Sequence, residues 1–306
     1  MARILAVGIA ALDIITTVDG YPPEDTEVRA LTRRIARGGN ATNTLVALSQ
    51  LGHACAWAGT LGDGEGAQVI LDDLRRHRIA TAACPVYRGA SPPTSYIVVS
   101  AATGSRTIVH YRDLPELTST DFAAVDLAGV DWVHFEGRNV PETRRMLERV
   151  RRDRPGLPCS LEVEKPRPEI EGLLGLVDVV LFSRHYARAR GHGEPARLFA
   201  ALRPRAPAAT LVCAWGEAGA SATSAAGGAC ESPAFPPVRV VETVGAGDVF
   251  NAGCIDALVR GVPLEQALVA ACRIAGRKCG QLGLEGLAAP GPGPRGSTAG
   301  LETSPQ

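Results

Sequence analysis

The chain has 306 residues, of which 45% are hydrophobic and 21% charged, and its 32 basic and 32 acidic side chains cancel. This apolar fraction excludes a wholly disordered chain, and no apolar run approaches the roughly 18 residues that a transmembrane helix needs. A net charge of zero gives no global field to attract nucleic acid or an anionic membrane. We therefore expect one large domain or two modest ones, with neither nucleic acid nor a membrane as a partner.

The sulfur and amine side chains bear on the compartment and the chemistry. The eight cysteines, at positions 55, 84, 159, 213, 230, 254, 272 and 279, form no CxxC pair and show no metal-ligand spacing. Most stand in apolar surroundings, so we expect reduced, buried thiols in a cytoplasmic protein. Only Lys165 and Lys278 are lysines, and neither is an obvious catalytic group. Residues 3–12 resemble the start of a signal peptide, but Asp13 ends the run early, and a buried first strand explains it equally well.

Short apolar runs alternate along the chain with stretches of helical periodicity. In the first half we predict strands at 3–8, 14–18 and 55–59, an extended arm at 27–36, helices at 40–51 and 67–77, and a hairpin from 94–100 and 106–111. In the second half we predict strands at 132–135, 160–163, 177–182 and 210–214, a hairpin starting at 219–223, and helices at 141–151, 195–202, 247–260 and 264–280.

This alternation predicts the fold class. Strands separated by helices imply parallel βαβ units and an α/β sheet covered on both faces. The early strands and the arm interrupt the rhythm, so we expect them to form a separate small sheet. The end of the chain is rich in Pro, Gly, Ser and Thr with little to bury, which predicts a domain over 1–286 and a disordered tail over 287–306.

The first segment with chemical meaning is Arg-Gly-Gly-Asn-Ala-Thr-Asn at residues 37–43, directly before a predicted helix. Paired glycines adopt backbone torsions barred to other residues. Asn40 can cap the helix, and Asn43 follows one turn later on the same side. Two amides so placed could hold the hydroxyls of a sugar, whereas a flexible turn with an N-cap is the simpler alternative.

The second segment is Glu-Thr-Val-Gly-Ala-Gly-Asp-Val-Phe-Asn at residues 242–251, which opens a helix whose buried stripe we place at Phe250, Cys254 and Leu258. Backbone amides at a glycine-rich helix N-terminus can converge on an anion. Asp248, in the first turn, could then take the proton of a hydroxyl that attacks a phosphoryl group. The alternative is that Asp248 only stabilises the helix N-terminus.

In this order and about 200 residues apart, the two segments resemble the signature regions of the ribokinase-like PfkB carbohydrate kinases. Within that family, further segments resemble the ketohexokinases, the fructokinases that form fructose 1-phosphate: Asp13, 21–25, 106–109, 136–139, 162–167, 213–215 and 234–237. The resemblance covers about residues 1–286. It implies a three-layer α/β/α sandwich with a small β-sheet lid, or β-clasp, built from about 13–37 and 94–111.

The resemblance also implies roles for individual residues. Fructose would be held by Asp13, Gly39, Asn40 and Asn43. Arg106 would contact the nucleotide phosphates, and the ATP site would be lined by Gly216, Glu217, Ala218, Gly219, Gly245, Ala246, Gly247 and Asp248. Asp248 would be the general base, and the helix N-terminus from Gly245 to Asp248 would be the anion hole.

The activity implied is ATP-dependent phosphorylation of D-fructose at O1 to give fructose 1-phosphate and ADP. We expect Mg²⁺ to be required, because phosphoryl transfer concentrates negative charge. A single hydroxyl contact can dominate sugar selectivity, so a kinase for ribose, tagatose or a nucleoside is an alternative. A catalytically silent binding relative is another, although such a protein would be expected to lose Asp248 or the glycines.

Four acidic residues leave alternatives open. Glu242 stands where the family usually has Asp, which puts in doubt a nearby K⁺ site. Glu162 and Glu164 project the same way from a strand and could organise Mg²⁺ through water, or belong to an ion-pair network; we assign no direct metal ligand. Asp25 lies in the small-sheet region, where the resemblance implies a homodimer clasped through the lid; an exposed turn is the alternative.

Overall fold

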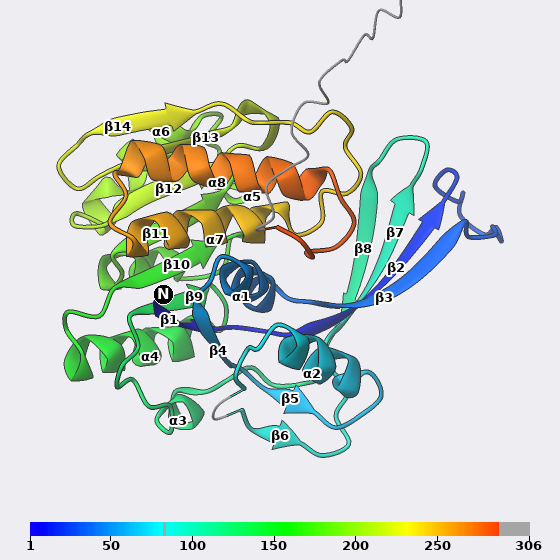
Figure 1. The fold of residues 1–306 in the computed structure, drawn as a ribbon, viewed down its shortest axis with the longest axis horizontal. Helices are drawn as coiled ribbons and strands as arrows, with labels where there is room; N and C mark the ends of the chain where they lie inside the picture. The colour runs from blue at the N-terminus through cyan, green and yellow to red at the C-terminus, as the bar shows by residue number, and fades with distance from the viewer. Residues whose placement is uncertain (82–83, 288–306) are drawn as a thin grey trace, which may run out of the picture.

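The computed structural model describes residues 1–81 and 84–287. Within them, eight strands form a central sheet in the order β14-β13-β12-β11-β10-β9-β1-β4 (Figure 1). These strands are β1 (Arg3–Val7), β4 (Ala54–Ala58), β9 (Trp132–Glu136), β10 (Cys159–Val163), β11 (Val179–Ser183), β12 (Thr210–Ala214), β13 (Ala220–Thr223) and β14 (Ala229–Ser232). Pairing is parallel from β4 through β12, and β13 and β14 add an antiparallel edge.

Helices cover both faces of this sheet (Figure 1). One face packs against α1 (Asn40–Gln50), α2 (Ala67–Arg76), α7 (Ala246–Val259) and α8 (Leu264–Cys279). The other packs against α4 (Val140–Asp153), α5 (Arg184–Ala189), α6 (Pro195–Leu202), the short α3 (Ser119–Phe122) and the 3-10 helix η1 (Ile170–Leu176). The alternation along β1 divides the core: Leu5 and Val7 enter one layer, and Ile4 and Ala6 the other. Among the described residues, no helix is both long enough and apolar enough to cross a membrane.

A second sheet stands beside the sandwich and is called the lid here (Figure 1). In the described chain it has four strands in the order β3 (Thr32–Gly38), β2 (Ala11–Val18), β7 (Thr94–Ser100) and β8 (Arg106–Tyr111). A two-stranded sheet of β5 (Leu61–Gly62) and β6 (Val86–Tyr87) lies apart from it. The prediction of an α/β/α sandwich with a small β lid is confirmed.

The structure differs from the sequence expectations in four places. Residues 27–31 of the predicted arm are exposed and not in a strand, and β3 begins only at Thr32. The predicted buried stripe on α7 is too narrow, because every residue from Asp248 to Ile255 is buried where α7 packs against α1 and α8, whereas Leu258 is only partly buried. The short elements α3, α5, β5, β6, η1, η2 (Arg203–Arg205) and η3 (Gly216–Ala218) were not predicted. Leu287, assigned to the tail, is buried in the core, while the remaining tail lies outside the described residues.

Candidate active site

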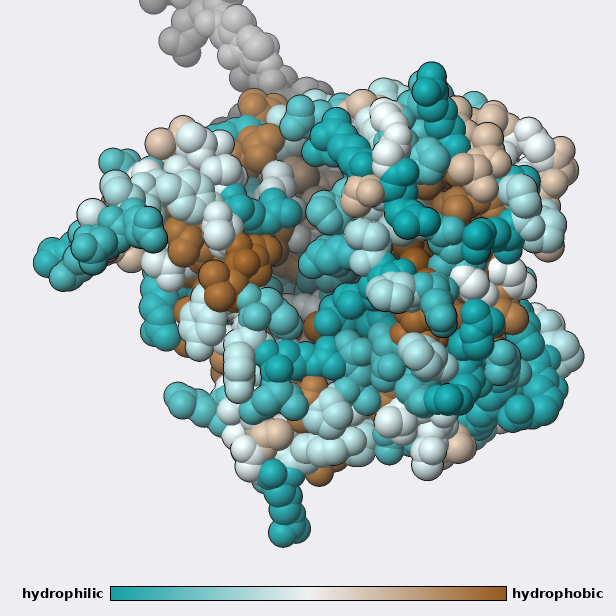
Figure 2. Space-filling model, turned by 180° about the vertical axis from the view of Figure 1, so that it is seen from behind, coloured by the Kyte–Doolittle hydropathy of each residue, from teal (hydrophilic) through white to brown (hydrophobic). Residues whose placement is uncertain are grey.

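A cavity of about 500 Å³ lies between the lid and the carboxyl ends of the parallel strands. Figure 2 shows the corresponding hollow between the lid and the body of the molecule. Parallel α/β sheets present their ligand sites at this edge, because every strand ends there in a loop. Of the sequence-predicted residues, those that line it are Asp13, Gly39, Asn40, Asn43, Arg106, Gly245, Gly247 and Asp248. The four residues of the 216–219 segment form η3 and the turn after it, and they do not line this cavity.

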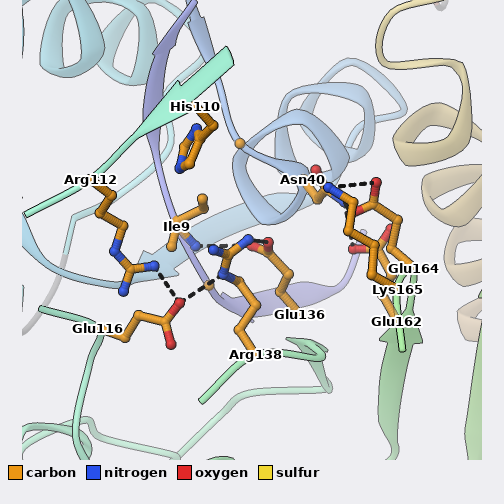
Figure 3. Close-up of polar contacts among 12 residues, drawn as sticks. Ile9, Asn40, His110, Arg112, Glu116, Glu136, Arg138, Glu162, Glu164 and Lys165 are labelled. Carbon is orange, nitrogen blue, oxygen red and sulfur yellow. Dashed lines mark hydrogen bonds and ion pairs between the residues drawn. The ribbon is translucent and has the colours of Figure 1, made fainter. Parts of the chain in front are cut away.

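The glycine pair before α1 allows a close approach of two segments. Gly39 has φ 102° and is the N-cap of α1, and a Cβ there would collide with the carbonyl oxygen of Ile9. Asn40 is therefore the first helical residue and not the cap that the sequence predicts. Its amide nitrogen instead donates to Glu162 Oε2 and Glu164 Oε2, both at 3.2 Å (Figure 3). Both amide hydrogens are used, which leaves the amide oxygen as an acceptor facing the cavity.

Asn43 connects the first segment to the second. Its oxygen accepts a hydrogen bond of 2.7 Å from Arg37 Nη1, and its nitrogen donates one of 2.7 Å to Asp248 Oδ2. Arg37 is 8% exposed and is itself held by Asp73, whose Oδ2 lies 2.6 Å from Arg37 Nε. Because a guanidinium can only donate, it fixes the Asn43 amide with its nitrogen toward Asp248.

Asp248 lies in the first turn of α7 and is 7% exposed. Burial raises the pKa of its carboxyl group to about 8, and the hydrogen bond from Asn43 opposes this shift. A carboxyl group with such a pKa is poised to exchange a proton near neutral pH. The side chain faces the cavity, so the proton it exchanges can belong to a bound molecule.

The helix N-terminus beside Asp248 is shaped for an anion. Gly245 is the N-cap of α7 with φ 81°, a left-handed conformation that favours glycine. A Cβ at Gly247 would meet no atom within 4 Å, so this position opens onto free space. Ala246 N donates to Thr243 O at 3.2 Å, whereas an α-helix leaves its next N–H groups without intrahelical partners. Gly247 and Asp248 bring such groups to the cavity.

The lid contributes a row of polar groups to the opposite wall. Asp13 on β2 pairs in register with Ser95 on β7, which pairs with His110 on β8. All three line the cavity, and Ser95 Oγ lies 3.2 Å from His110 Nδ1. Burial raises the pKa of Asp13, and a hydrogen bond with Ser95 opposes that shift. The adjacent Gly38 has no side chain, and a Cβ there would collide with the Asp13 carboxylate.

Buried carboxylates lie at the floor of the site and next to it: Glu162 lines the cavity, and the neighbouring Glu136 does not. Glu136 and Glu162 are both 5% exposed and are paired in register on neighbouring strands. Glu162 Oε1 accepts a hydrogen bond of 3.0 Å from Asn251 Nδ2 on α7. Burial raises the pKa of both glutamates, and nearby Asp248 adds to the rise for Glu162. The shared direction of Glu162 and Glu164 is as the sequence predicts. Both accept hydrogen bonds from the Asn40 amide, and Glu164 also forms an ion pair with Lys165.

The network around Glu136 lies next to the cavity, and sequence reasoning did not identify it (Figure 3). Sequence reasoning also did not identify the cavity-lining residues Ser95, His110 and Asn251. Glu136 accepts from Ile9 N at 3.0 Å and from Arg138 Nη1 at 3.2 Å. Arg138 also donates to Glu116 at 2.8 Å, and Glu116 binds Arg112. The signal that could have indicated it is a carboxylate at the end of a buried strand, since Glu136 closes β9 next to Glu162 on β10.

Cations lie around the mouth of the cavity. Arg106 on the lid strand β8 donates from Nη1 to Thr243 Oγ1 at 2.8 Å, in the loop before Gly245. Lys165 Nζ lies 3.6 Å from Glu164 Oε1, and Arg138 and Arg167 line the same space. The cavity thus combines a cationic rim with an acidic floor. Its floor offers the carboxylate oxygens that Mg²⁺ prefers as ligands. Glu164 is more exposed there than Glu162.

Comparison with known proteins agrees with this geometry. The family model for pfkB family carbohydrate kinases matches residues 1–288. The chain is 41% identical to mouse ketohexokinase over 293 residues, which cover 93% of this chain and 98% of the mouse protein. It is 26% identical to the ribokinase of Bacillus subtilis strain 168 over 290 residues, which cover 94% and 96% of the two chains.

A solved structure shows the same fold at lower identity. Arabidopsis thaliana ribokinase, complexed with ribose and ATP, superimposes with a TM-score of 0.76 at 20% identity, covering 92% of this chain and 94% of that one. The family match spans almost the whole chain, and the mouse relative shares two fifths of its residues. The chain therefore belongs to the pfkB family of carbohydrate kinases, and it is an ATP-dependent sugar kinase.

Proposed function

We propose that the protein transfers the γ-phosphoryl group of ATP to O1 of D-fructose, giving fructose 1-phosphate and ADP. The observation that carries the chemistry is the place of Asp248, a buried carboxyl group in the first turn of α7 that faces the cavity. The choice of fructose rests on the 41% identity to ketohexokinase.

In this proposal Asp248 is the general base. Its carboxylate accepts the proton of the fructose O1 hydroxyl as O1 attacks the γ-phosphorus. The bond between the γ-phosphorus and the β–γ bridging oxygen breaks, and ADP leaves with that electron pair. Asn43 holds one carboxylate oxygen by a hydrogen bond, which leaves the other for the proton. A base of this kind contributes about 10²–10⁴-fold to a rate.

The α7 N-terminus would receive the transferred phosphoryl group. The backbone N–H groups of Gly247 and Asp248, with the positive end of the helix dipole, favour the negative charge that develops there. Arg106 would reach the nucleotide phosphates from the lid, since it already contacts the loop that leads to Gly245. Glu217 and its neighbours in η3 would belong to the nucleotide side, beyond the cavity described above.

Mg²⁺ would accompany ATP and neutralise charge on its phosphates when bound. Glu164, and Glu162 behind it, are the residues that would hold the ion, directly or through water. A K⁺ site at Glu242 is a separate question from the Mg²⁺ site. The Glu242 carboxylate already accepts hydrogen bonds from Lys278 Nζ at 3.0 Å and from Gly283 N at 2.9 Å, and it forms an ion pair with Arg34. We propose that this carboxylate is not a K⁺ ligand.

The sugar would lie between the lid and α1. Asp13 presents a buried carboxyl group to the sugar. Asn40 presents its amide oxygen, because its amide nitrogen already donates to Glu162 and Glu164. Gly39 has no side chain, so its backbone can approach the sugar closely. These groups would orient the acceptor hydroxyl toward Asp248, which is the contribution of positioning to the rate.

Product analysis tests the proposal. Purified enzyme with ATP, Mg²⁺ and D-fructose should form fructose 1-phosphate, identified by phosphorus-coupled NMR. A panel containing ribose, tagatose and nucleosides, read by ADP release, serves as the comparison. Fructose 6-phosphate as the product, or rapid turnover of another acceptor without turnover of fructose, would overturn the substrate assignment and leave the kinase class intact. No turnover of any acceptor would favour a silent binding relative.

We further propose a homodimer formed through the outer face of the lid. Ile14 on β2 pairs in register with Ile35 and Tyr96, and Tyr96 pairs with Val109, so one apolar row crosses all four strands of the described lid. Tyr96 is 51% and Val109 64% exposed. Figure 2 shows apolar side chains gathered on the lid side of the molecule. An apolar sheet face of this kind needs cover, and a second copy supplies a matching one.

Solution mass tests this assembly. Wild-type protein should run as a dimer in size-exclusion chromatography with light scattering, and Val109→Glu should shift it toward the monomer. A wild-type monomer at micromolar concentration would contradict the proposal.

For the compartment, we propose the cytoplasm. Cys55, Cys159 and Cys213 are buried thiols outside any disulfide, and burial raises the pKa of each to about 12, as expected for cysteines kept reduced.

A further inference from the structure

Lys278, near the end of α8, is fully buried at 0% exposure. Its ammonium group lies among three oxygens: Glu242 Oε2 at 3.0 Å, Glu242 O at 3.2 Å and Gln281 O at 3.3 Å. An ammonium group donates three hydrogen bonds, so all of its donors are used. Burying an ammonium group is costly unless it is paired and hydrogen-bonded. This cost indicates that the buried ammonium group of Lys278 serves to hold these three oxygens in place.

Glu242, which accepts two of the three hydrogen bonds from Lys278, lies three residues before the N-cap of α7. The Glu242 carboxylate also binds Arg34 of the lid strand β3 and accepts from Gly283 N at 2.9 Å. Next to it, Val241 N donates to Cys279 O at 2.7 Å. One partly buried carboxylate therefore joins the lid, the end of α8 and the segment that leads into the anion hole.

Lys278 also lies directly beside that anion hole. A Cβ built on Gly245 would be 3.8 Å from Lys278 Cε and 3.8 Å from Asn43 Nδ2. Gly245 thus lies close both to the lysine stem and to the amide that orients Asp248. A shift of the 242–245 loop would displace the first N–H groups of α7.

We propose that Lys278 is a positioning residue for phosphoryl transfer, acting through Glu242 to fix the 242–245 loop and the N-terminus of α7. The inference rests on the proposed role of that helix end as the anion hole. Anion-hole donors stabilise charge only when they are held in place before the reaction. Loss of the Lys278 ammonium group should therefore lower kcat while leaving the KM of the acceptor sugar nearly unchanged, because the sugar contacts proposed at Asp13 and Asn40 are elsewhere.

The test compares three variants with the wild type. Lys278→Met keeps the length of the stem and removes the charge, and Lys278→Ala leaves a space beside Glu242. Arg273→Met is the matched control, since it removes an exposed cation of α8 that stacks on Phe235 and does not line the cavity. Removing one donor of an anion hole costs about 10²–10³-fold in kcat, and we expect displacement of the whole loop to cost at least about tenfold. Arg273→Met should keep the wild-type kcat.

Chemical rescue separates positioning from general loss of structure. Added ammonium or methylammonium ions should occupy the space in Lys278→Ala, bind the same three oxygens and restore kcat several-fold relative to wild type at the same salt concentration. Lys278→Met, which fills that space, should not respond. A Lys278→Ala protein that is folded by circular dichroism and impaired, yet shows no rescue, would overturn the inference. So would a folded Lys278→Met protein with wild-type kcat.

A double variant covers the case in which the single variants do not fold. Removing one partner of a buried pair leaves an uncompensated charge, whereas removing both is milder. Lys278→Met with Glu242→Gln should fold and still show the reduced kcat, and wild-type kcat in this protein would overturn the inference. All variants are read on whichever acceptor the wild type phosphorylates. A failure on fructose alone therefore counts against the proposed substrate and not against Lys278.

Discussion

The amide of Asn43 and the carboxylate of Asp248 are joined by a hydrogen bond of 2.7 Å across 205 residues of sequence. Each belongs to one of the two glycine-rich segments. Asn43 lies one turn into α1, and Asp248 lies in the first turn of α7. The bond brings the proposed sugar contacts and the proposed anion hole into one cavity. The proposed base, Asp248, and the residue that orients it, Asn43, can be mutated separately, so the effect of each on kcat can be measured.

Replacing the proposed base should stop the reaction without preventing binding. Asp248→Asn keeps the shape of the side chain and removes the proton acceptor, so kcat should fall by about 10²–10⁴-fold. Isothermal titration calorimetry should show ATP and fructose affinities close to those of the wild type. Near-wild-type turnover in a correctly folded variant would reject the role of Asp248.

The pH dependence follows from the same carboxyl group. Burial raises its pKa from 3.8 to about 8 in the folded protein, and the base is active only when it is deprotonated. Plots of kcat/KM against pH should therefore rise through about pH 8 and level off above it. Activity that already reaches its maximum at pH 5 would show that the free enzyme keeps Asp248 ionised.

Stability should change in the opposite sense over this range. A carboxyl group with a raised pKa binds its proton more tightly in the folded chain than in the unfolded chain, so it favours folding below pH 4 and loses this contribution as pH rises toward 8. Asp248→Asn does not titrate, and its Tm should exceed that of the wild type by a margin that grows from pH 4 to pH 8.

Arg37 should matter for stability and for turnover together. It binds Asp73, Thr42 and Asn43 while 8% exposed, and breaking a buried ion pair from one side costs about 3–5 kcal/mol. Arg37→Met should lower the free energy of unfolding in urea by about that amount, and kcat should fall because Asn43 is no longer oriented. The control is Arg33→Met, an exposed arginine of the same strand. Equal unfolding curves for the two variants would contradict the role of Arg37.

Arg106 should act mainly on the nucleotide. Its guanidinium group can bind phosphate through two parallel hydrogen bonds, which an aliphatic side chain cannot replace. Arg106→Ala should raise the KM for ATP more than the KM for fructose in initial-rate assays. An equal rise in both would instead assign Arg106 to lid placement, through its 2.8 Å contact with Thr243.

The end of the domain can be located by truncation. Deleting residues 288–306 should change neither Tm nor activity, because that segment has few apolar residues to bury. Leu287 is 1% exposed, and its N–H donates to Gln50 Oε1 at 2.9 Å. Leu287→Ala in the truncated chain should cost about 2–5 kcal/mol of stability. A large drop in Tm on the first deletion would show that the tail contributes to the fold.

Local sequence patterns are enough to predict most of the elements and the two chemical segments. Hydrophobic runs such as that of β1 and the helical spacing in α1 follow directly from which residues must be buried, so strands and long helices were predicted to within about two residues in most cases. Glycines before α1 and α7 were identified because left-handed or crowded backbone requires them, as at Gly39 and Gly245. Short elements such as α3 were not predicted, because four residues are too few to show a helical periodicity.

The partners of the buried polar side chains, in contrast, depend on how the elements pack. Asn40 was expected to cap its own helix, but Gly39 takes that place, and the Asn40 amide binds two glutamates more than 120 residues away. Arg37 and Lys278 carry no local signal for their roles, because a buried charge is defined by the distant group that pairs with it. The position of Glu136 at the end of a buried strand indicates a site but not its partners. Sequence specifies which residues are buried; the packing of β9 against β10 and of α7 against α8 determines what each buried polar group meets.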